Sequence, residues 1–122
     1  MPCLFLRNVP ANITFQPMLV QQFHRDLADA DGGEFGSFEI HIEYGRYDLL
    51  MPDGSLQRAP NVHVFVEGHA RPLEVKREIA ILTDQFLKAH GIGEGTDITF
   101  RDSPAETFFL NGRLFKGGPL RR

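Results

Sequence analysis

The spacing of apolar residues changes along the chain from a strand pattern to a helix pattern and back, and this alternation constrains the fold most. Residues 2–9 form a mostly apolar run typical of a buried strand, and residues 38–44 alternate apolar and polar side chains. Between these two runs, apolar positions recur at helical spacing. They are Phe15, Met18, Leu19, Phe23, Leu27 and Ala30. The first third of the chain therefore predicts a strand–helix–strand unit.

A second unit of the same kind follows. Residues 62–67 alternate again, Pro72 starts a helix, and residues 97–101 predict a further strand. The apolar stripe of this helix consists of Val75, Ile79, Leu82, Phe86 and Ala89. Each helix needs an apolar surface to cover, so two tandem units predict an α/β (α+β) fold with two helices on one face of a four-stranded mixed sheet.

Turn-forming residues predict where the elements end. Thr14 is expected to cap the first helix, with Pro17 in its first turn, and the Asp31-Gly32-Gly33 cluster is expected to end it. Residues 45–60 predict a hairpin-like insertion around a Pro-Asp-Gly turn.

A second short hairpin is expected around Asn111-Gly112, because Asn-Gly favours two-residue hairpin turns. Residues 116–122 contain two Gly and one Pro and predict a flexible C-terminal tail. We see no linker between the two units, so residues 1–115 are predicted to form a single domain with the hairpin at 45–60 as an insertion.

One face of the predicted sheet has no helix to cover it. Its side chains are mixed, and the face is expected either to contact water or to form an oligomer interface. They are Glu39, His41, Glu43, His63, Phe65, Glu67, Thr99 and Arg101.

Composition excludes several classes of protein. The chain has 122 residues, a net charge of −3 and no block of five like charges, which argues against binding to nucleic acid or to an anionic membrane. No apolar run approaches the length of a membrane span, and the N-terminus has no targeting pattern. With a single cysteine, Cys3, the chain cannot form an internal disulfide. These features predict a soluble, cytoplasmic protein.

The five histidines show no metal-ligand spacing such as His-Glu-x-x-His. A site built from His41 and His63, if these lay on adjacent strands, would still need a third ligand from Glu39, Glu43 or Glu67. The sequence therefore predicts no metal and no cofactor.

Pro2 is the residue with the most distinctive chemistry. Methionine is generally removed before a small residue such as proline, and Pro2 would then carry a free secondary amine. The reference pKa of an α-amino group is about 7.7–8.0, so modest desolvation or a nearby positive charge would leave it neutral and able to move a proton next to a carbonyl. The alternative interpretation is that Met1 is retained and Pro2 is simply a suitable first residue of a strand.

A Met-Pro start followed by two strand–helix–strand units resembles the tautomerase superfamily, which includes 4-oxalocrotonate tautomerase and macrophage migration inhibitory factor. The resemblance spans residues 2–115 and is strongest at residues 66–74, which are similar to the family's strand-to-helix turn, and at residues 108–112, which are similar to its C-terminal hairpin. It is closest to bacterial members of two-unit length with no established activity.

The resemblance implies roles for individual residues. Pro2 would be the catalytic base, and Arg71 would bind a substrate carboxylate, the alternative being a solvated turn arginine. Phe108 would form an apolar wall near the proline, or else pack in the core or in a trimer interface. Where members carry a further arginine or tyrosine on the fourth strand, this chain has Asp97, and Arg46 from the same or a neighbouring subunit could substitute for it.

Two hypotheses about function follow from the resemblance. The first is keto–enol tautomerisation of a small 2-keto acid by a cofactor-independent homotrimer. The second is a non-catalytic oligomeric scaffold or ligand-binding protein that keeps the fold without the chemistry.

Overall fold

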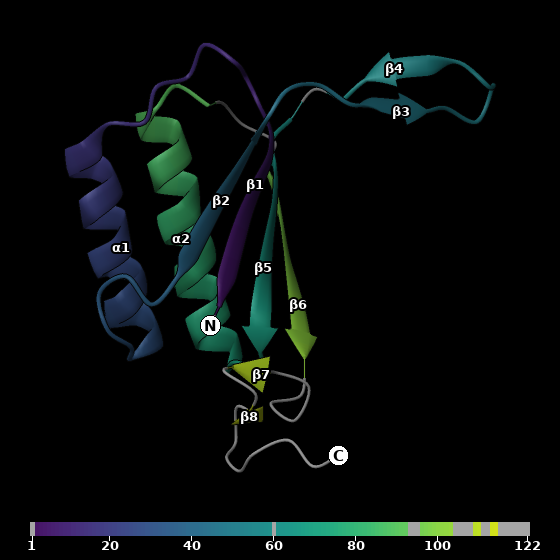
Figure 1. Ribbon diagram of the computed structural model, residues 1–122. Coiled ribbons are helices and arrows are strands. Elements are labelled where there is room, and N and C mark those ends of the chain that lie inside the picture. Colours follow the sequence, from purple (N-terminus) through teal and green to yellow (C-terminus); the bar gives the residue numbers. More distant parts are fainter. Residues whose placement is uncertain (1, 60, 93–95, 104–108, 111–112, 115–122) are drawn as a thin grey trace.

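Figure 1 shows the computed structural model, in which two helices lie on one side of a sheet. It describes residues 2–59, 61–92, 96–103, 109–110 and 113–114, of which residues 103, 109–110 and 113–114 are described by their backbone alone. The sheet has the order β2-β1-β5-β6. Its strands are β1 (Cys3–Val9), β2 (Glu39–Tyr44), β5 (His63–His69) and β6 (Asp97–Ser103).

Strand directions make the sheet mixed, as the sequence predicts. Strand β1 runs parallel to β2 and antiparallel to β5, and β5 runs parallel to β6. The helices α1 (Pro17–Asp31) and α2 (Leu73–Ala89) are the crossovers of the two parallel pairs. The prediction of two tandem units with both helices on one face is therefore confirmed (Figure 1).

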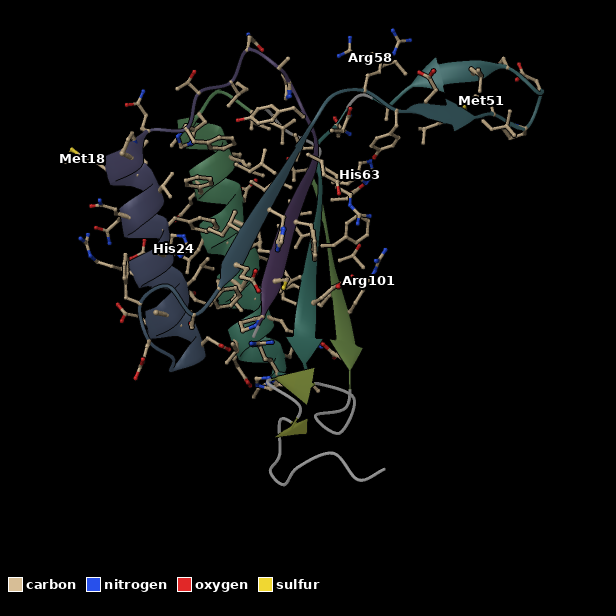
Figure 2. The ribbon with its side chains drawn as sticks, in the orientation of Figure 1. Met18, His24, Met51, Arg58, His63 and Arg101 are labelled. Carbon is tan, nitrogen blue, oxygen red and sulfur yellow. The ribbon has the colours of Figure 1, made fainter. Side chains whose placement is uncertain are left out.

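The core lies between the helices and the sheet. Leu4 and Leu6 on β1 are fully buried, and Leu27 on α1 and Ile79 on α2 are buried with them. Alternation along each strand sends the neighbouring side chains to the uncovered face, where His63 and Arg101 are labelled in Figure 2. The first strand is thus two-faced, although the apolar run at residues 2–9 suggested burial on both sides.

Of the two predicted ends of α1, only the C-terminal one is confirmed. The prediction that Thr14 caps the helix is wrong, because the N-cap is Gln16, whose backbone N–H donates to His90 Nε2 at 3.0 Å. The imidazole satisfies the N–H of the N-cap residue itself, and no side chain of that residue caps the first turn. At the other end Gly32 adopts φ 69° and donates its N–H to Ala28, so the predicted glycine stop is confirmed.

Replacing Gly32 with alanine should lower the free energy of unfolding by about 1 kcal/mol, because a Cβ is disfavoured in the left-handed conformation. Nothing lies within 4 Å of a Cβ built there, so packing would not add to the cost. Gly32→Asn should cost less, since asparagine tolerates this conformation better. Urea denaturation of the three proteins measures the difference, and equal losses for Ala and Asn would contradict the conformational explanation.

The insertion folds as an antiparallel hairpin of β3 (Asp48–Leu50) and β4 (Leu56–Arg58), which projects away from the sheet (Figure 1). Beyond β6, a short antiparallel pair joins β7 (Phe109–Leu110) to β8 (Arg113–Leu114), while the predicted Asn111-Gly112 turn and the 116–122 tail lie outside the described residues. No helix in the described part of the chain is long and apolar enough to cross a membrane.

Candidate active site

Pro2 lies at the end of the sheet where β1 begins and β5 ends. Cys3 pairs with Glu67 across the two antiparallel strands, which brings Gly68 opposite Pro2. A Cβ built on Gly68 would lie 3.5 Å from Cα and Cβ of Pro2 and 2.8 Å from Nη1 of Arg71. A side chain at position 68 would therefore displace the Arg71 guanidinium. Pro2, Gly68 and Arg71 form one compact corner of the molecule, here called the Pro2–Arg71 corner.

Arg71 is buried and paired, so it is not the solvated turn arginine that the sequence left open. Its side chain is 4% exposed, and its Nε and Nη2 donate to the two oxygens of Asp31 at 2.5 and 3.0 Å. Its Nη1 donates to the carbonyl of His69 at 3.0 Å. This two-pronged pair ties the end of α1 to the turn that precedes α2.

Arg71 keeps part of its binding capacity. A guanidinium has five N–H groups, and the bonds to Asp31 and His69 use three of them. One proton on Nη1 and one on Nη2 remain, and Nη1 is the atom that lies nearest Gly68. A carboxylate bound there would meet a cation whose charge is already shared with Asp31.

Sequence reasoning missed a second ion pair at this end of the sheet. Strand register places Asp102 of β6 beside Gly68, and Lys76 Nζ lies 2.5 Å from Asp102 Oδ2. Lys76 also lies 5.8 Å from the centre of the Phe100 ring. No sequence pattern pairs residues so far apart in the chain, and only the strand register could have indicated that Asp102 lies near Pro2.

Asp97 lies at the opposite end of the sheet from Pro2. It pairs with His63 in the β5–β6 register, five positions before the Gly68–Asp102 pair, which at about 3.3 Å per residue is about 17 Å away. Its carboxylate lies 3.7 Å from Nδ1 of His63. Within one chain, Asp97 therefore does not lie beside Pro2. The basic group that it approaches, His63, also lies outside the corner.

Arg46 also lies far from Pro2 along the sheet. It follows β2, which runs parallel to β1 and away from the corner, and its half-exposed side chain lies 3.3 Å from Asp48 at the base of the hairpin. Only a second copy of the chain could bring it to a Pro2–Arg71 corner. Phe108 lies outside the described residues.

The uncovered face carries both aromatic and charged groups. Arg7 and Arg101 stack on the ring of Phe65 at 4.8 and 4.2 Å, and each also pairs with a glutamate, Glu43 or Glu67. The suggested adjacency of His41 and His63 is wrong, because β1 lies between β2 and β5.

Cys3 is the only thiol, and it lies next to Pro2 in the chain. Burial raises the pKa of Cys3 above its ordinary value, and the negative charge of Glu39 raises it further. Without a bound cation, the thiol is therefore a weaker acid than an ordinary cysteine, and Pro2 remains the better candidate for the base.

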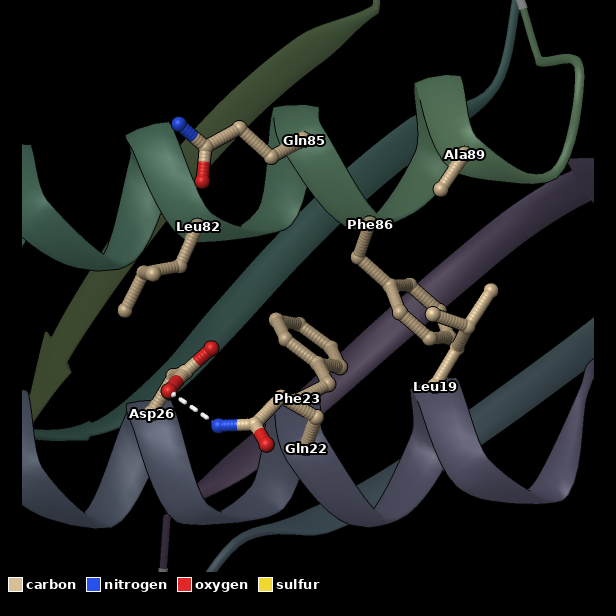
Figure 3. Close-up of a pocket in the computed structure, with 8 residues that line it drawn as sticks. All are labelled: Leu19, Gln22, Phe23, Asp26, Leu82, Gln85, Phe86 and Ala89. Carbon is tan, nitrogen blue, oxygen red and sulfur yellow. Dashed lines mark hydrogen bonds between the residues drawn. The ribbon is translucent and has the colours of Figure 1, made fainter.

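An apolar groove lies between the two helices, away from this corner. It has a volume of about 150 Å³, and Figure 3 shows Phe23 of α1 and Phe86 of α2 facing each other in it. Asp26 is the only titratable side chain among the described residues that line it, and it accepts a hydrogen bond from Gln22. Among the described residues, the groove therefore has a carboxylate but no cation to bind an organic acid.

Comparisons with solved structures find the same architecture in proteins of low sequence identity. The chain matches a protein of unknown function from Vibrio cholerae at 21% identity with a TM-score of 0.70, covering 93% of this chain and 87% of that one. A fused 4-OT described as an asymmetric trimer matches at 16% identity and a TM-score of 0.72, covering 93% and 96%.

A macrophage migration inhibitory factor homologue from Prochlorococcus marinus matches at 21% identity and a TM-score of 0.68, covering 93% and 98%. No protein-family model and no curated protein matches the sequence. The order of the strands, the two helices on one face and these structural matches together show that the chain has the tautomerase fold, shared with 4-OT and macrophage migration inhibitory factor.

Proposed function

We propose that the chain catalyses keto–enol tautomerisation of a small 2-keto acid, with the amine of Pro2 moving the proton. The observation that carries the proposal is the position of Pro2 at the head of β1, half-buried and packed against Gly68 beside the Arg71 guanidinium. Its carbonyl accepts a hydrogen bond from the N–H of Glu39 at 3.0 Å, so the backbone of the base is held in place.

Two features favour a neutral amine. Partial burial disfavours the charged form of the amine, and the guanidinium of Arg71 adds a positive charge nearby. Asp31 offsets part of that charge. The proline ring fixes φ, so the amine sits on a stiff strand end.

Arg71 is proposed to bind the substrate carboxylate through the second Nη1 proton, and Phe108 is proposed as the apolar wall of the same pocket. Arg46 would contribute from a neighbouring copy in a homotrimer. Fused 4-OT proteins of this fold are described as trimers, and the uncovered face, with Phe5 and Phe65, offers a surface for such contacts.

The second candidate is a non-catalytic scaffold or ligand-binding protein of the same fold. The pairing of Arg71 with Asp31 favours it, because an arginine already neutralised by a buried carboxylate binds a substrate anion less strongly. The two candidates differ in whether the amine of Pro2 is free and reactive.

We expect protein isolated from its native host to lack Met1 and to gain the mass of one reagent molecule from 2-oxo-3-pentynoate. A protein of this fold with 14% identity and a TM-score of 0.59 is described as inactivated by this compound. The amine nitrogen would form a bond to the alkyne carbon distal to the ketone, and the amine proton would end on the carbon next to the ketone. Intact mass and peptide mapping measure both expectations.

Cys3 provides the control, since a thiol could add to the same alkyne. Cys3→Ser should be labelled as the parent protein is, whereas protein that retains Met1 should not be labelled at Pro2. Retention of Met1 in the native host, or labelling confined to Cys3, would rule out Pro2 as the base and favour the scaffold.

A further inference from the structure

We propose that Cys3, Glu39 and His41 form a binding site for a divalent cation of the zinc type on the uncovered face of the sheet. The register of the parallel pair β1–β2 sets Cys3 beside Glu39 and Phe5 beside His41. Alternation along β2 puts Glu39 and His41 on the same face. One potential ligand atom from each of the three side chains lies within 4.8 Å of the other two.

The distances within this triad are close to those of a zinc site. Cys3 Sγ lies 3.8 Å from one oxygen of Glu39, and His41 Nε2 lies 3.8 Å from the other. Metal bonds of about 2.0–2.3 Å at tetrahedral angles separate neighbouring ligand atoms by about 3.3–3.6 Å. Small side-chain rotations would therefore bring the three atoms around one ion, with no change in the strands.

The chemistry of the three groups favours zinc over magnesium or calcium. Thiolate sulfur and imidazole nitrogen bind zinc, whereas magnesium and calcium take oxygen ligands. Three protein ligands leave a fourth tetrahedral position for water, and in the single chain the side chains of Glu39 and His41 are about half exposed.

The surroundings hold the ligands and supply negative charge. The ring of Phe5 stacks on His41 at 4.6 Å between centroids and so restricts the imidazole. Glu67 lies opposite Cys3 on β5 and places a second carboxylate near the thiol, with its charge partly offset by Arg101. The nearest arginines are already paired with carboxylates outside the triad, Arg7 with Glu43 and Arg101 with Glu67.

The triad is separate from the Pro2–Arg71 corner. Successive side chains on a strand point to opposite faces, so Cys3 faces away from the side on which Pro2 meets Gly68. The proposal therefore goes beyond the tautomerase chemistry and does not depend on it.

Titration of the full chain with Co²⁺ and Zn²⁺ tests the site. We expect one ion per chain, a sulfur-to-cobalt charge-transfer band in the near ultraviolet, and loss of that band on adding Zn²⁺. Cys3→Ser should abolish the band. His41→Gln should weaken Zn²⁺ binding at least about tenfold, because losing even an outer-shell partner of a metal ligand costs that much. His41 is exposed, so this variant should fold normally.

His63→Gln is the matched control, because His63 lies on the same face but outside the triad. It should bind Zn²⁺ as the parent protein does. Absence of a thiolate–cobalt band, or equal Zn²⁺ affinity in the parent and His41→Gln, would overturn the proposal. Labelling of Pro2 by 2-oxo-3-pentynoate should be unchanged in His41→Gln, so the outcome is independent of the proposed enzyme activity.

Discussion

Replacing Pro2 with alanine should lower kcat/KM for tautomerisation of an aryl enolpyruvate at least about 100-fold, the usual contribution of a positioned general base. The variant keeps an α-amine but loses the ring that fixes φ at the head of β1, so the base is no longer held at the reacting carbon. Enolpyruvate decay followed by absorbance, corrected for the spontaneous reaction, gives the rate constants.

Pro10→Ala is the matched control for this variant. Pro10 is exposed just past the far end of β1, so the same chemical change there should leave the rate unaltered. The free energy of unfolding of Pro2→Ala should stay within about 0.5 kcal/mol of the parent. Undiminished turnover would contradict the role of Pro2.

Replacing Asp31 with alanine should lower the free energy of unfolding by about 3–5 kcal/mol. The substitution leaves the Arg71 guanidinium charged and unpaired where its side chain is 4% exposed, and it frees the tie between α1 and the turn before α2. Urea denaturation measures the loss, provided that the variant still unfolds in a single transition.

Two further proteins separate the ion pair from the effect of losing a side chain. Asp29→Ala removes an exposed aspartate from the same turn of α1 and should change stability by less than about 0.5 kcal/mol. The double variant Asp31→Ala/Arg71→Met should be more stable than Asp31→Ala, because the unpaired charge is gone. Equal stability of Asp31→Ala and Asp29→Ala would show that the pair contributes little.

The same variant bears on substrate binding. If Arg71 binds carboxylates, Asp31→Ala should be stabilised by millimolar formate or acetate, which can take the place of the missing side chain. Asp29→Ala should show no such response.

The fold could be predicted because the spacing of apolar residues distinguishes strands from helices and indicates which face of each is buried. The alternation at residues 38–44 and 62–67 identified the core-facing and uncovered sides of two strands, and the helix stripes required both helices to cover the same face. The left-handed glycine after α1 was equally readable, since the conformation itself demands a residue such as glycine.

The site was less predictable, because its contacts join residues that are distant in the chain. Asp31 and the two glycines after it form a pattern typical of a helix end. Nothing in the neighbouring sequence indicates that Asp31 pairs with Arg71, 40 residues later. The triad of Cys3, Glu39 and His41 depends on β1 lying beside β2 in one register. The apolar run at residues 2–9 did not predict this arrangement, because it gave no indication that β1 has an uncovered face.

The hairpin of β3 and β4 should open at a lower free energy than the four-stranded sheet. Three residue pairs join its strands, Leu50 and Leu56 are largely exposed, and the hairpin projects away from the sheet (Figure 1). An isolated two-stranded hairpin is only marginally stable in water, so its amide hydrogens should exchange through local opening, while those of β1 and β5 exchange only when the whole molecule unfolds. A break in the hairpin would therefore leave the sheet, the Pro2–Arg71 corner and the metal triad in place.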